Sequence, residues 1–347
     1  MYSLKKLKKT GFEVFPIIIP DRSSLKSTNF YLVNQEHSLS LIDAGWNNEE
    51  CWEGLINTLN NNGFTLKDLT EIILTHHHID HIGLVNRITS EHPIKVYSHP
   101  DSILRLKRDP IFLDMRVEFY AQLYHEMGCG EDGEKHGAYL KKAVQKNKQN
   151  VIQGDVIEIF DKQLLNFNII EVPGHSPDQI AFHEKKHNWL FAGDLLLEHI
   201  SSNALVEPDS LGRRIPTLLQ HIDSLKKCLE LNVDLVFPGH GTLIDQPDSL
   251  ILKRLDRIDA KAERIIHLIQ SGCLTGSEIA QSYYKNTYYE QFSLVMSEII
   301  GHLDYLEAQG RIKKELIRGI YGYRDIVKRI MLVAHDPLIF FRSGHSY

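Results

Sequence analysis

The chain has 347 residues, which is enough for one large domain and a smaller second one. Hydrophobic residues make up 42% of it and charged residues 24%, the composition of an ordinary soluble globular protein. The formal net charge of −6 argues against a protein that mainly coats nucleic acid. The four cysteines contain no CxxC pair, so neither a disulfide framework nor a cysteine zinc site is expected.

No segment of the sequence is typical of membrane insertion. The first residues are basic, but the apolar core of a signal peptide does not follow them. The apolar run at residues 17–19 is far too short to span a bilayer, and no later run approaches the needed length. We therefore expect a cytoplasmic protein that works without a membrane.

The first hundred residues alternate short strands with helices. Residues 12–19, 29–33 and 38–42 are predicted to be strands, separated by polar turns. A helical spacing of apolar residues follows at 51–60, and a further strand is predicted at 94–97. Strands that alternate with helices indicate a layered α/β sandwich.

A predicted strand at residues 71–74 runs into a histidine-rich segment. In an extended chain the side chains alternate between two faces, so His76 and His78 point the same way and the histidine between them points to the other. Asp80 and His81 fall where the chain turns into a helix-like segment, so they can face a second point nearby. Imidazole and carboxylate suit zinc, and ligands delivered in pairs favour two metal ions over one.

Residues 102–149 break the alternation of strands and helices. Helix-compatible stretches at 115–127 and 139–148 are joined by a Gly-Cys-Gly turn, which predicts a helical insertion or lid. Its run of lysines is interpreted as a solvated helix face rather than a phosphate site. Three tyrosines, Tyr120, Tyr124 and Tyr139, are interpreted as packing residues rather than as the lining of a substrate channel.

Strands return after the insertion and bring more polar residues to strand ends. Strands are predicted at residues 155–160, 167–172, 180–183, 189–192 and 233–237, and one helix is predicted at 217–231. Four times in the chain a strand stops at a single Asp or His beside glycine, namely at Asp43, His175, Asp194 and His240. Glycine lets the backbone turn sharply there. Together with the histidine-rich segment, these residues supply enough ligands for two metal ions.

The motifs that contain these residues resemble, in order, those of the metallo-β-lactamase-fold superfamily, in its glyoxalase II and lactamase-beta-2-like branch. They are Leu-Ile-Asp-Ala-Gly at 41–45, His-x-His-x-Asp-His at 76–81, Gly-His at 174–175, Gly-Asp at 193–194 and Gly-His-Gly at 239–241. The resemblance implies an αββα sandwich with the metals at one edge of the two sheets. His81 and Asp194 depart from true β-lactamases, which commonly use a cysteine ligand.

The resemblance also implies a role for each candidate residue. The expected metal ligands are His76, His78 and His175 for the first zinc ion and Asp80, His81 and His240 for the second, with Asp194 bridging both. Asp80 and Asp43 are the expected catalytic residues, because Asp80 would orient the nucleophile and Asp43 would orient a ligand histidine. Two zinc ions per chain are expected, with manganese and iron as alternatives.

A second unit follows the predicted catalytic domain. Apolar residues trace one face of a long helix at 252–269, a capping box from Thr275 to Glu278 opens a short helix, and a third helix at 292–306 precedes a hairpin-like segment. Three helices and a hairpin resemble a winged-helix domain, but the acidic third helix argues against DNA recognition. The expected division is a catalytic domain at 1–248 with a helical insertion at about 101–150, a winged-helix-like domain at 249–325 and a tail at 326–347.

These features together lead to a prediction of activity. Two zinc ions lower the pKa of water and polarise a carbonyl or phosphoryl group. The expected activity is that of a dinuclear zinc-dependent hydrolase that attacks a small acyl thioester, ester or lactone with a metal-bridging hydroxide. The alternative is a metal-dependent phosphodiesterase or endoribonuclease acting on single-stranded RNA, with Arg213 and Arg214 as candidate phosphate contacts. The expected binding partner is a small acyl substrate, and nucleic acid is the less favoured alternative. The chain could also form a homodimer, which the sequence does not decide.

The order of the units leads to one further expectation. The insertion leaves the catalytic domain directly after the strand that follows the metal motif, so its helices are expected to lie over the metal edge and to shape the pocket. The C-terminal helices carry continuous apolar stripes that must be buried, so they are expected to determine stability.

Overall fold

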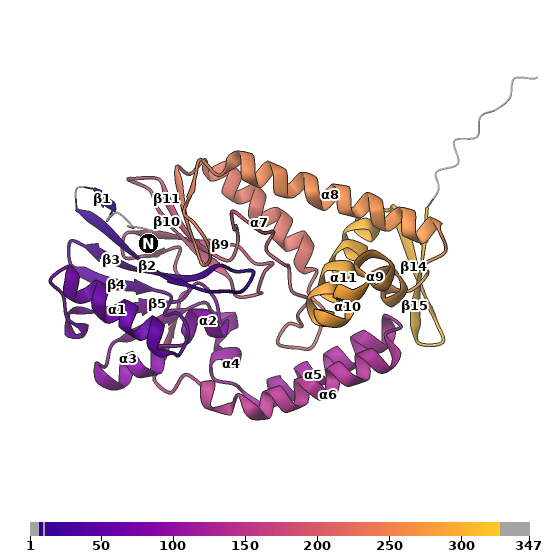
Figure 1. The fold of residues 1–347 in the computed structure, drawn as a ribbon, viewed down its shortest axis with the longest axis horizontal. Coiled ribbons are helices and arrows are strands. Elements are labelled where there is room, and N and C mark those ends of the chain that lie inside the picture. The colour runs from indigo at the N-terminus through magenta and orange to yellow at the C-terminus, as the bar shows by residue number, and fades with distance from the viewer. Residues whose placement is uncertain (1–6, 10, 327–347) are drawn as a thin grey trace, which may run out of the picture.

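The computed structural model describes residues 7–9 and 11–326 of the chain, and its centre is a pair of β-sheets (Figure 1). The first sheet contains, in spatial order, β1 (Leu7–Lys9), β2 (Phe12–Pro20), β3 (Ser27–Gln35), β4 (Ser38–Ile42), β5 (Glu71–Ile73), β6 (Lys95–Ser98) and β7 (Val156–Glu158). The second contains β13 (Ile244–Asp245), β12 (Leu235–Pro238), β11 (Trp189–Gly193), β10 (Ile180–Glu184), β9 (Phe167–Glu171) and β8 (Gln163–Leu164). Of the predicted tail, Ile326 alone lies within the described residues.

Both faces of each sheet are covered. In β3 the side chains alternate, so Tyr31 and Val33 pack between the sheets while Phe30 and Leu32 pack toward helices. The helices on the first sheet are α1 (Glu49–Asn61) and α3 (Val85–Glu91), and those on the second are α7 (Thr217–Leu231) and α8 (Asp248–Gln270). The predicted α/β fold is therefore confirmed, with a helical layer outside each sheet.

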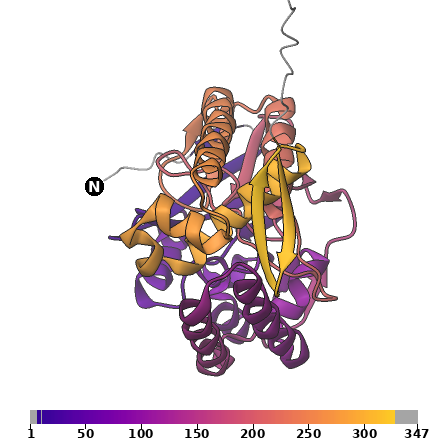
Figure 2. The same ribbon diagram turned by 90° about the vertical axis from the view of Figure 1, so that its right-hand side faces the viewer.

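The insertion is helical, as predicted, but its two main helices are longer than the sequence pattern indicates. It contains α4 (Ile103–Leu106), α5 (Pro110–Glu126) and α6 (Gly130–Lys146), with α5 and α6 lying side by side (Figures 1 and 2). Several glycines made the first half of α6 look unlike a helix. One of them, Gly133, allows close packing, because a Cβ there would lie 2.8 Å from the Cβ of Tyr124.

The C-terminal unit is built from helices and one hairpin. After α8 come α9 (Gly276–Tyr284), α10 (Asn286–Glu290), α11 (Phe292–Ala308) and the strands β14 (Ile312–Ile317) and β15 (Ile320–Asp325). The capping box is confirmed, since the Glu278 amide donates to the Thr275 hydroxyl and the Thr275 amide donates to the Glu278 carboxylate. Sequence analysis did not predict α10. The remaining short helices of the described part are α2 (Ile79–Ile82) and the 3₁₀ turns η1 (Leu66–Asp68), η2 (Pro100–Ser102) and η3 (Lys148–Asn150).

The insertion and the C-terminal unit share one hydrophobic core. Tyr120 and Tyr124 of α5 are buried in the same cluster as Met296, Ile299 and Leu303 of α11. The interpretation as packing residues is therefore confirmed for Tyr120 and Tyr124 but is wrong for Tyr139, which lies exposed on α6. Figure 1 shows α8 running from the sandwich to this unit on one side, while α5 and α6 run along the other. Within residues 7–9 and 11–326, no helix is long and apolar enough to cross a membrane.

A buried ion network ties the insertion to the segment after β11. The Glu207 carboxylate accepts a hydrogen bond from Arg116 of α5, and the guanidinium of Arg105 lies 3.6 Å from it. The Tyr120 hydroxyl donates to the Val206 carbonyl at 2.7 Å. Burial alone would raise the pKa of Glu207, but the positive charges of Arg116 and Arg105 lower this pKa to about 2.

Glu207→Gln is expected to lower the free energy of unfolding at pH 7 by about 3–5 kcal/mol, because two guanidinium groups lose their buried counter-charge. A carboxylate whose pKa falls on folding stabilises the protein above its unfolded pKa, here about 4.5, and this stabilisation is lost as the pH falls toward about 2. Urea unfolding at pH 7 and pH 3 should therefore show a smaller pH effect in the variant.

The control for this experiment is Glu131→Gln. Glu131 forms an exposed ion pair with Lys135 one helical turn away, so its loss should change stability by less than about 0.5 kcal/mol at either pH. Equal stability and equal pH dependence of wild type and Glu207→Gln would show that the buried network does not hold the insertion in place.

Candidate metal centre

All five motifs lie just after the carboxyl end of a strand. Asp43 follows β4, His76 follows β5, His175 follows β9, Asp194 follows β11 and His240 follows β12. Strands β4 and β5 are parallel, and β9, β11 and β12 share one direction because β9 and β11 are each antiparallel to β10 while β11 is parallel to β12. The strand ends of both sheets therefore meet at one edge of the sandwich, where ligands commonly bind in α/β proteins.

The structure brings all seven predicted ligands together there. Within the described residues, groups of side chains whose nitrogen or oxygen atoms lie within 4.8 Å of one another are His76 with His78 and His175, His76 with His81 and Asp194, and Asp80 with His81 and His240. Residues far apart in sequence thus form one contiguous cluster of imidazoles and carboxylates, which is the donor set that zinc and similar divalent ions prefer.

Three histidines form the first part of the cluster. The Nδ1 atom of His78 lies 3.0 Å from Nε2 of His76 and 3.0 Å from Nε2 of His175. Burial is the main cause that lowers the pKa of each of these imidazoles, and neighbouring imidazoles contribute to the lowering. Three neutral nitrogens therefore point at one another, an arrangement suited to sharing a cation.

The second part consists of one carboxylate and two imidazoles, those of Asp80, His81 and His240. The Oδ2 atom of Asp80 lies 3.3 Å from Nε2 of His240 and 3.9 Å from Nε2 of His81. Burial alone would raise the pKa of Asp80, but His81 and His240 lower it to about 2. Burial alone would lower the pKa of His240, but Asp194 and Asp80 raise it to about 10. Buried negative charge is therefore concentrated at this point, where it would attract a cation.

Asp194 contacts both parts of the cluster. Its Oδ2 atom lies 3.4 Å from Nε2 of His175 and 3.2 Å from Nε2 of His240, and its Oδ1 atom lies 3.4 Å from Nε2 of His81. Gly239 makes this position accessible, since a Cβ at that residue would lie 2.2 Å from Oδ1 of Asp194 and 2.6 Å from Cε1 of His81. Asp194 is thus placed between the two groups of histidines.

Hydrogen bonds on the far side of the rings fix their orientation. Four of the histidines have an acceptor near Nδ1, which leaves the lone pair of Nε2 directed into the cluster. The pairs are His76 with the Thr75 hydroxyl, His81 with the Asp43 carboxylate, His175 with the Asn203 carbonyl and His240 with the Ser27 carbonyl, at 2.7–3.0 Å. The protein therefore presents these rings in the tautomer that a metal requires.

Asp43 supports the cluster without entering it. Its carboxylate accepts hydrogen bonds from the amide and the hydroxyl of Thr75, both at 2.8 Å, and from Nδ1 of His81 at 2.8 Å. The residue has a φ of 58°, a left-handed conformation that is uncommon for a residue with a side chain. The strand end is thus bent so that one carboxylate orients two different parts of the histidine-rich segment.

Several polar atoms at the centre contact one another at 3.2–3.4 Å but form no hydrogen bond within the described part of the chain. Nε2 of His81, Oδ1 of Asp194 and Nε2 of His240 are buried without a hydrogen bond. Buried polar atoms are nearly always satisfied, and leaving one unsatisfied costs about 1–3 kcal/mol. Three such atoms directed at one point fit a cation, so these side chains are suited to hold a metal.

His77 faces away from the cluster, as the alternation of side chains predicts. Its Nδ1 atom lies 2.7 Å from Oδ1 of the buried Asp178, and the Ser176 hydroxyl donates to the same oxygen at 2.8 Å. His77 is absent from the groups of candidate ligands within the described ranges. It therefore links the histidine-rich segment to the turn that follows β9.

A cavity of about 470 Å³ opens over the cluster. His78, Asp80, His175, Asp194 and His240 form its polar floor. The other lining residues come from a turn after β2, from the segment after β11 and from the C-terminal unit, namely Ser23, Ser24, Leu25, Leu197, Ile200, Ser201, Ser202, Asn203, Leu205, Tyr284, Thr287, Gln291, Leu294, Val295 and Glu298. Apolar and uncharged polar side chains thus surround a few charged ones.

The lining corrects the expectation about the insertion. Of the residues described, none between 102 and 149 lines this cavity, so α5 and α6 do not shape it as predicted. They pack instead against the C-terminal unit, whose helices α10 and α11 form the wall. Sequence analysis missed these wall residues because they belong to no motif and the apolar stripe of α11 indicates burial alone.

The predicted phosphate contacts lie elsewhere. Nε of Arg213 pairs with the Asp209 carboxylate at 2.7 Å, and Nη1 of Arg214 pairs with the Asp304 carboxylate at 2.6 Å. Neither arginine lines the cavity over the cluster. The suggestion that they bind phosphate at the metal centre is therefore wrong, and both form structural ion pairs.

The site and fold agree with comparisons to known proteins. The family model for the metallo-beta-lactamase superfamily matches residues 24–240, a range that contains every candidate ligand. The chain belongs to the metallo-beta-lactamase superfamily and is a metal-dependent hydrolase. A probable metallo-hydrolase of Bacillus subtilis (strain 168), YqjP, is 30% identical over 309 residues, which cover 87% of this chain and 95% of that protein.

Two further similarities extend this assignment. The metallo-beta-lactamase family protein TTHA1429 from Thermus thermophilus has the same fold, with a TM-score of 0.74, 22% identity and coverage of 92% of this chain and 99% of that one. An atrochrysone carboxyl ACP thioesterase of Aspergillus fumigatus is 21% identical over 253 residues, which are 73% of this chain and 62% of that protein. The fold of TTHA1429 therefore extends over nearly the whole chain.

Gly239→Ala is expected to lower the free energy of unfolding by about 1–3 kcal/mol, because the added methyl group overlaps Asp194 and His81 in a closely packed site. Chemical denaturation of the metal-free protein measures this effect independently of metal binding. Gly154→Ala is the matched control, since a Cβ there would meet nothing within 4 Å. A variant at Gly239 as stable as this control would mean that the backbone does not need to approach the two side chains so closely.

Proposed function

We propose that the cluster binds two zinc ions, one held by His76, His78 and His175 and the other by Asp80, His81 and His240, with Asp194 shared between them. The three buried atoms that form no hydrogen bond, Nε2 of His81, Oδ1 of Asp194 and Nε2 of His240, support this proposal most directly. The position of Asp194 supports two ions rather than one, because its two oxygens approach histidines of both groups. Two cations held close together repel each other, and a shared carboxylate between them reduces that repulsion.

The proposed reaction is hydrolysis of an acyl substrate. Ions bound there would make water more acidic and would polarise the carbonyl group of the substrate. The chain itself contributes Asp80, whose ionised carboxylate lines the cavity and can orient the attacking water. Asp43 does not contact the substrate, and it contributes by accepting a hydrogen bond from Nδ1 of His81, which orients that ring. These are the catalytic roles that we propose for the two aspartates.

A small acyl thioester is the substrate class that we favour. The cavity offers Leu25, Leu197, Leu205 and Leu294 to an acyl chain. A relative named as a thioesterase aligns with 73% of this chain. An endoribonuclease is less well supported, because the arginines predicted to bind phosphate are paired with acidic side chains elsewhere.

We further propose that the C-terminal unit, residues 249–325, is a winged-helix-like domain with a role in substrate selection. Its hairpin and helices have the order expected of such a domain. Helix α11 is buried along most of its length and directs Leu294, Val295 and Glu298 toward the cavity. A helix packed in this way serves as a wall of the site rather than as a reader of DNA.

The zinc-loaded protein is expected to hydrolyse short acyl thioesters more efficiently than single-stranded RNA of any sequence. The assay compares kcat/KM for a panel of acyl thioesters with the cleavage rate of a labelled RNA, each with and without a chelator. Zinc-dependent cleavage of the RNA with no turnover of any thioester or ester would replace the proposed activity by the phosphodiesterase alternative.

His78→Ala is expected to reduce zinc content from two ions to one, because it removes the imidazole that lies between His76 and His175. His77→Ala is the matched control: it should keep both ions but lower stability by about 1–3 kcal/mol, since it leaves a buried carboxylate with one partner fewer. Elemental analysis after zinc reconstitution measures the first effect and urea unfolding the second. Equal zinc loss in both variants would contradict the ligand assignment.

A further inference from the structure

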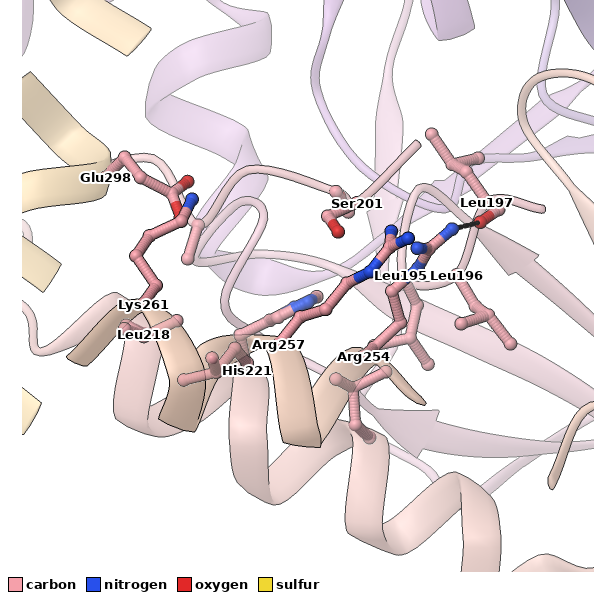
Figure 3. A pocket seen from close by; sticks show the side chains of 14 residues that line it. Leu195, Leu196, Leu197, Ser201, Leu218, His221, Arg254, Arg257, Lys261 and Glu298 are labelled. Atoms are coloured by element: carbon pink, nitrogen blue, oxygen red, sulfur yellow. Dashed lines mark hydrogen bonds and ion pairs between the residues drawn. The ribbon is translucent and has the colours of Figure 1, made fainter. Parts of the chain in front are cut away.

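A second, smaller cavity lies beside the one over the metal cluster. It has a volume of about 50 Å³ and is lined by residues of the segment after β11, of α7, of α8 and of α11. Leu197, Ser201, Ser202 and Glu298 line both cavities, so the two share a wall. Figure 3 shows the smaller cavity, which we call the side cavity, with Lys261 directed toward Glu298 and Arg254 toward Leu197.

The side cavity carries more positive than negative charge. Helix α8 presents Arg254, Arg257 and Lys261 to it, at a spacing that places all three on one helix face. Lys261 forms an ion pair with Glu298, the one carboxylate in the lining. Within the part of the chain that the structure describes, neither Arg254 nor Arg257 has a carboxylate within ion-pair distance.

Arg254 is fixed in place although its charge is not balanced. One guanidinium nitrogen, Nη2, donates hydrogen bonds to the carbonyls of Leu197, Glu198 and Ile200 at 2.8–2.9 Å. The residue is only 5% exposed, and its Nε atom is buried with no hydrogen-bond partner among the described residues. Burying a charge without a counter-charge is costly, so the site favours an anion from outside the chain.

His221 adds a second unsatisfied polar atom to the same cavity. It is 4% exposed, and its Nδ1 atom is buried without a hydrogen bond in the described structure. Burial is the main cause that lowers the pKa of His221 to about 4, so the ring is neutral near pH 7. A neutral imidazole can donate one hydrogen bond to an anion without adding charge.

We propose that the side cavity binds a carboxylate carried by the acyl group of the substrate, with Arg257 and Arg254 supplying the charge and His221 a hydrogen bond. This proposal rests on the proposed acyl hydrolase activity and adds to it that the preferred substrates are anionic. Arg257 is the exposed member of the group, and it lines the side cavity next to the buried Arg254. It would act as a specificity-determining residue that does not touch the scissile bond.

The size of the side cavity favours a carboxylate over a larger anion. A cavity of about 50 Å³ has room for a small planar group rather than a bulky one. A carboxylate is planar with three heavy atoms, whereas a phosphate is tetrahedral with five. The planar guanidinium of an arginine also matches the two oxygens of a carboxylate.

The first test measures binding of glutarate to the zinc-loaded protein by calorimetry, with the neutral diamide glutaramide as the uncharged comparison. Arg257→Gln should weaken glutarate binding about 10- to 100-fold, the usual effect of losing a hydrogen bond to a charged group. Lys253→Gln, which removes an exposed charge from the same helix outside the cavity, should leave binding unchanged. Direct coordination of glutarate to zinc is common to all variants and does not affect the comparison.

Equal affinity of Arg257→Gln and wild type for glutarate would overturn the proposal. Tighter binding of methyl phosphate than of glutarate, lost in the same variant, would overturn the choice of carboxylate and assign the side cavity to a phosphate. Equal affinity for glutarate and glutaramide would show that charge plays no part.

The second test separates the side cavity from the proposed activity. Mono-4-nitrophenyl glutarate and 4-nitrophenyl butyrate have the same leaving group but differ by one negative charge. Arg257→Gln should lower kcat/KM for the anionic ester about 10- to 100-fold, mainly through KM, and leave the neutral ester within about twofold. If neither ester is hydrolysed, the proposed activity fails while the glutarate measurement still decides the side cavity. An equal loss for both esters would overturn the specificity role.

Discussion

The carboxylate of Asp43 is the interaction on which the geometry of the site depends. It receives three hydrogen bonds from two residues of the histidine-rich segment, and it does so from a strand end held in a left-handed conformation. The hydroxyl of Thr75, which Asp43 orients, in turn contacts Nδ1 of His76. The carbonyl of Thr75 accepts a hydrogen bond from the amide of Ile180 in the second sheet. One buried negative charge therefore sets the direction of rings in both halves of the cluster and ties the first sheet to the second.

The second sheet is positioned by a comparable set of contacts. Asn29 and Tyr31 of β3 donate hydrogen bonds to the carbonyl of Pro238, and the amide of Asn29 donates to the carbonyl of Gly239. The turn that presents His240 is thus held by the opposite sheet, which lets the ring approach Asp194 closely. The candidate ligands lie in loops and in the short helix α2, and contacts from both sheets fix the backbone there, as precise coordination requires.

Local patterns in the sequence predicted the elements and the cluster well, because both depend on neighbours in the chain. Strand β4 and helix α7 have the predicted bounds, and the two-residue period of a strand placed His77 apart from His76 and His78. The wall of the cavity could not be predicted in this way. Residues such as Leu294 face it because α11 packs against α7 and α8, and such tertiary contacts leave no local signal. The wrong prediction that the insertion shapes the pocket has the same origin.

The cavity over the cluster is lined by both the sandwich and the C-terminal unit, and this has a thermodynamic consequence. A ligand that contacts both the candidate metal ligands and α11 makes all of its contacts only while the C-terminal unit is docked on the sandwich. Binding and docking are therefore linked, and each stabilises the other by the same free energy. Amide hydrogens of α10 and α11 would exchange more slowly with solvent when the cavity is filled, although these helices hold none of the candidate ligands. The C-terminal unit thereby reports on occupancy of a site that another part of the chain builds.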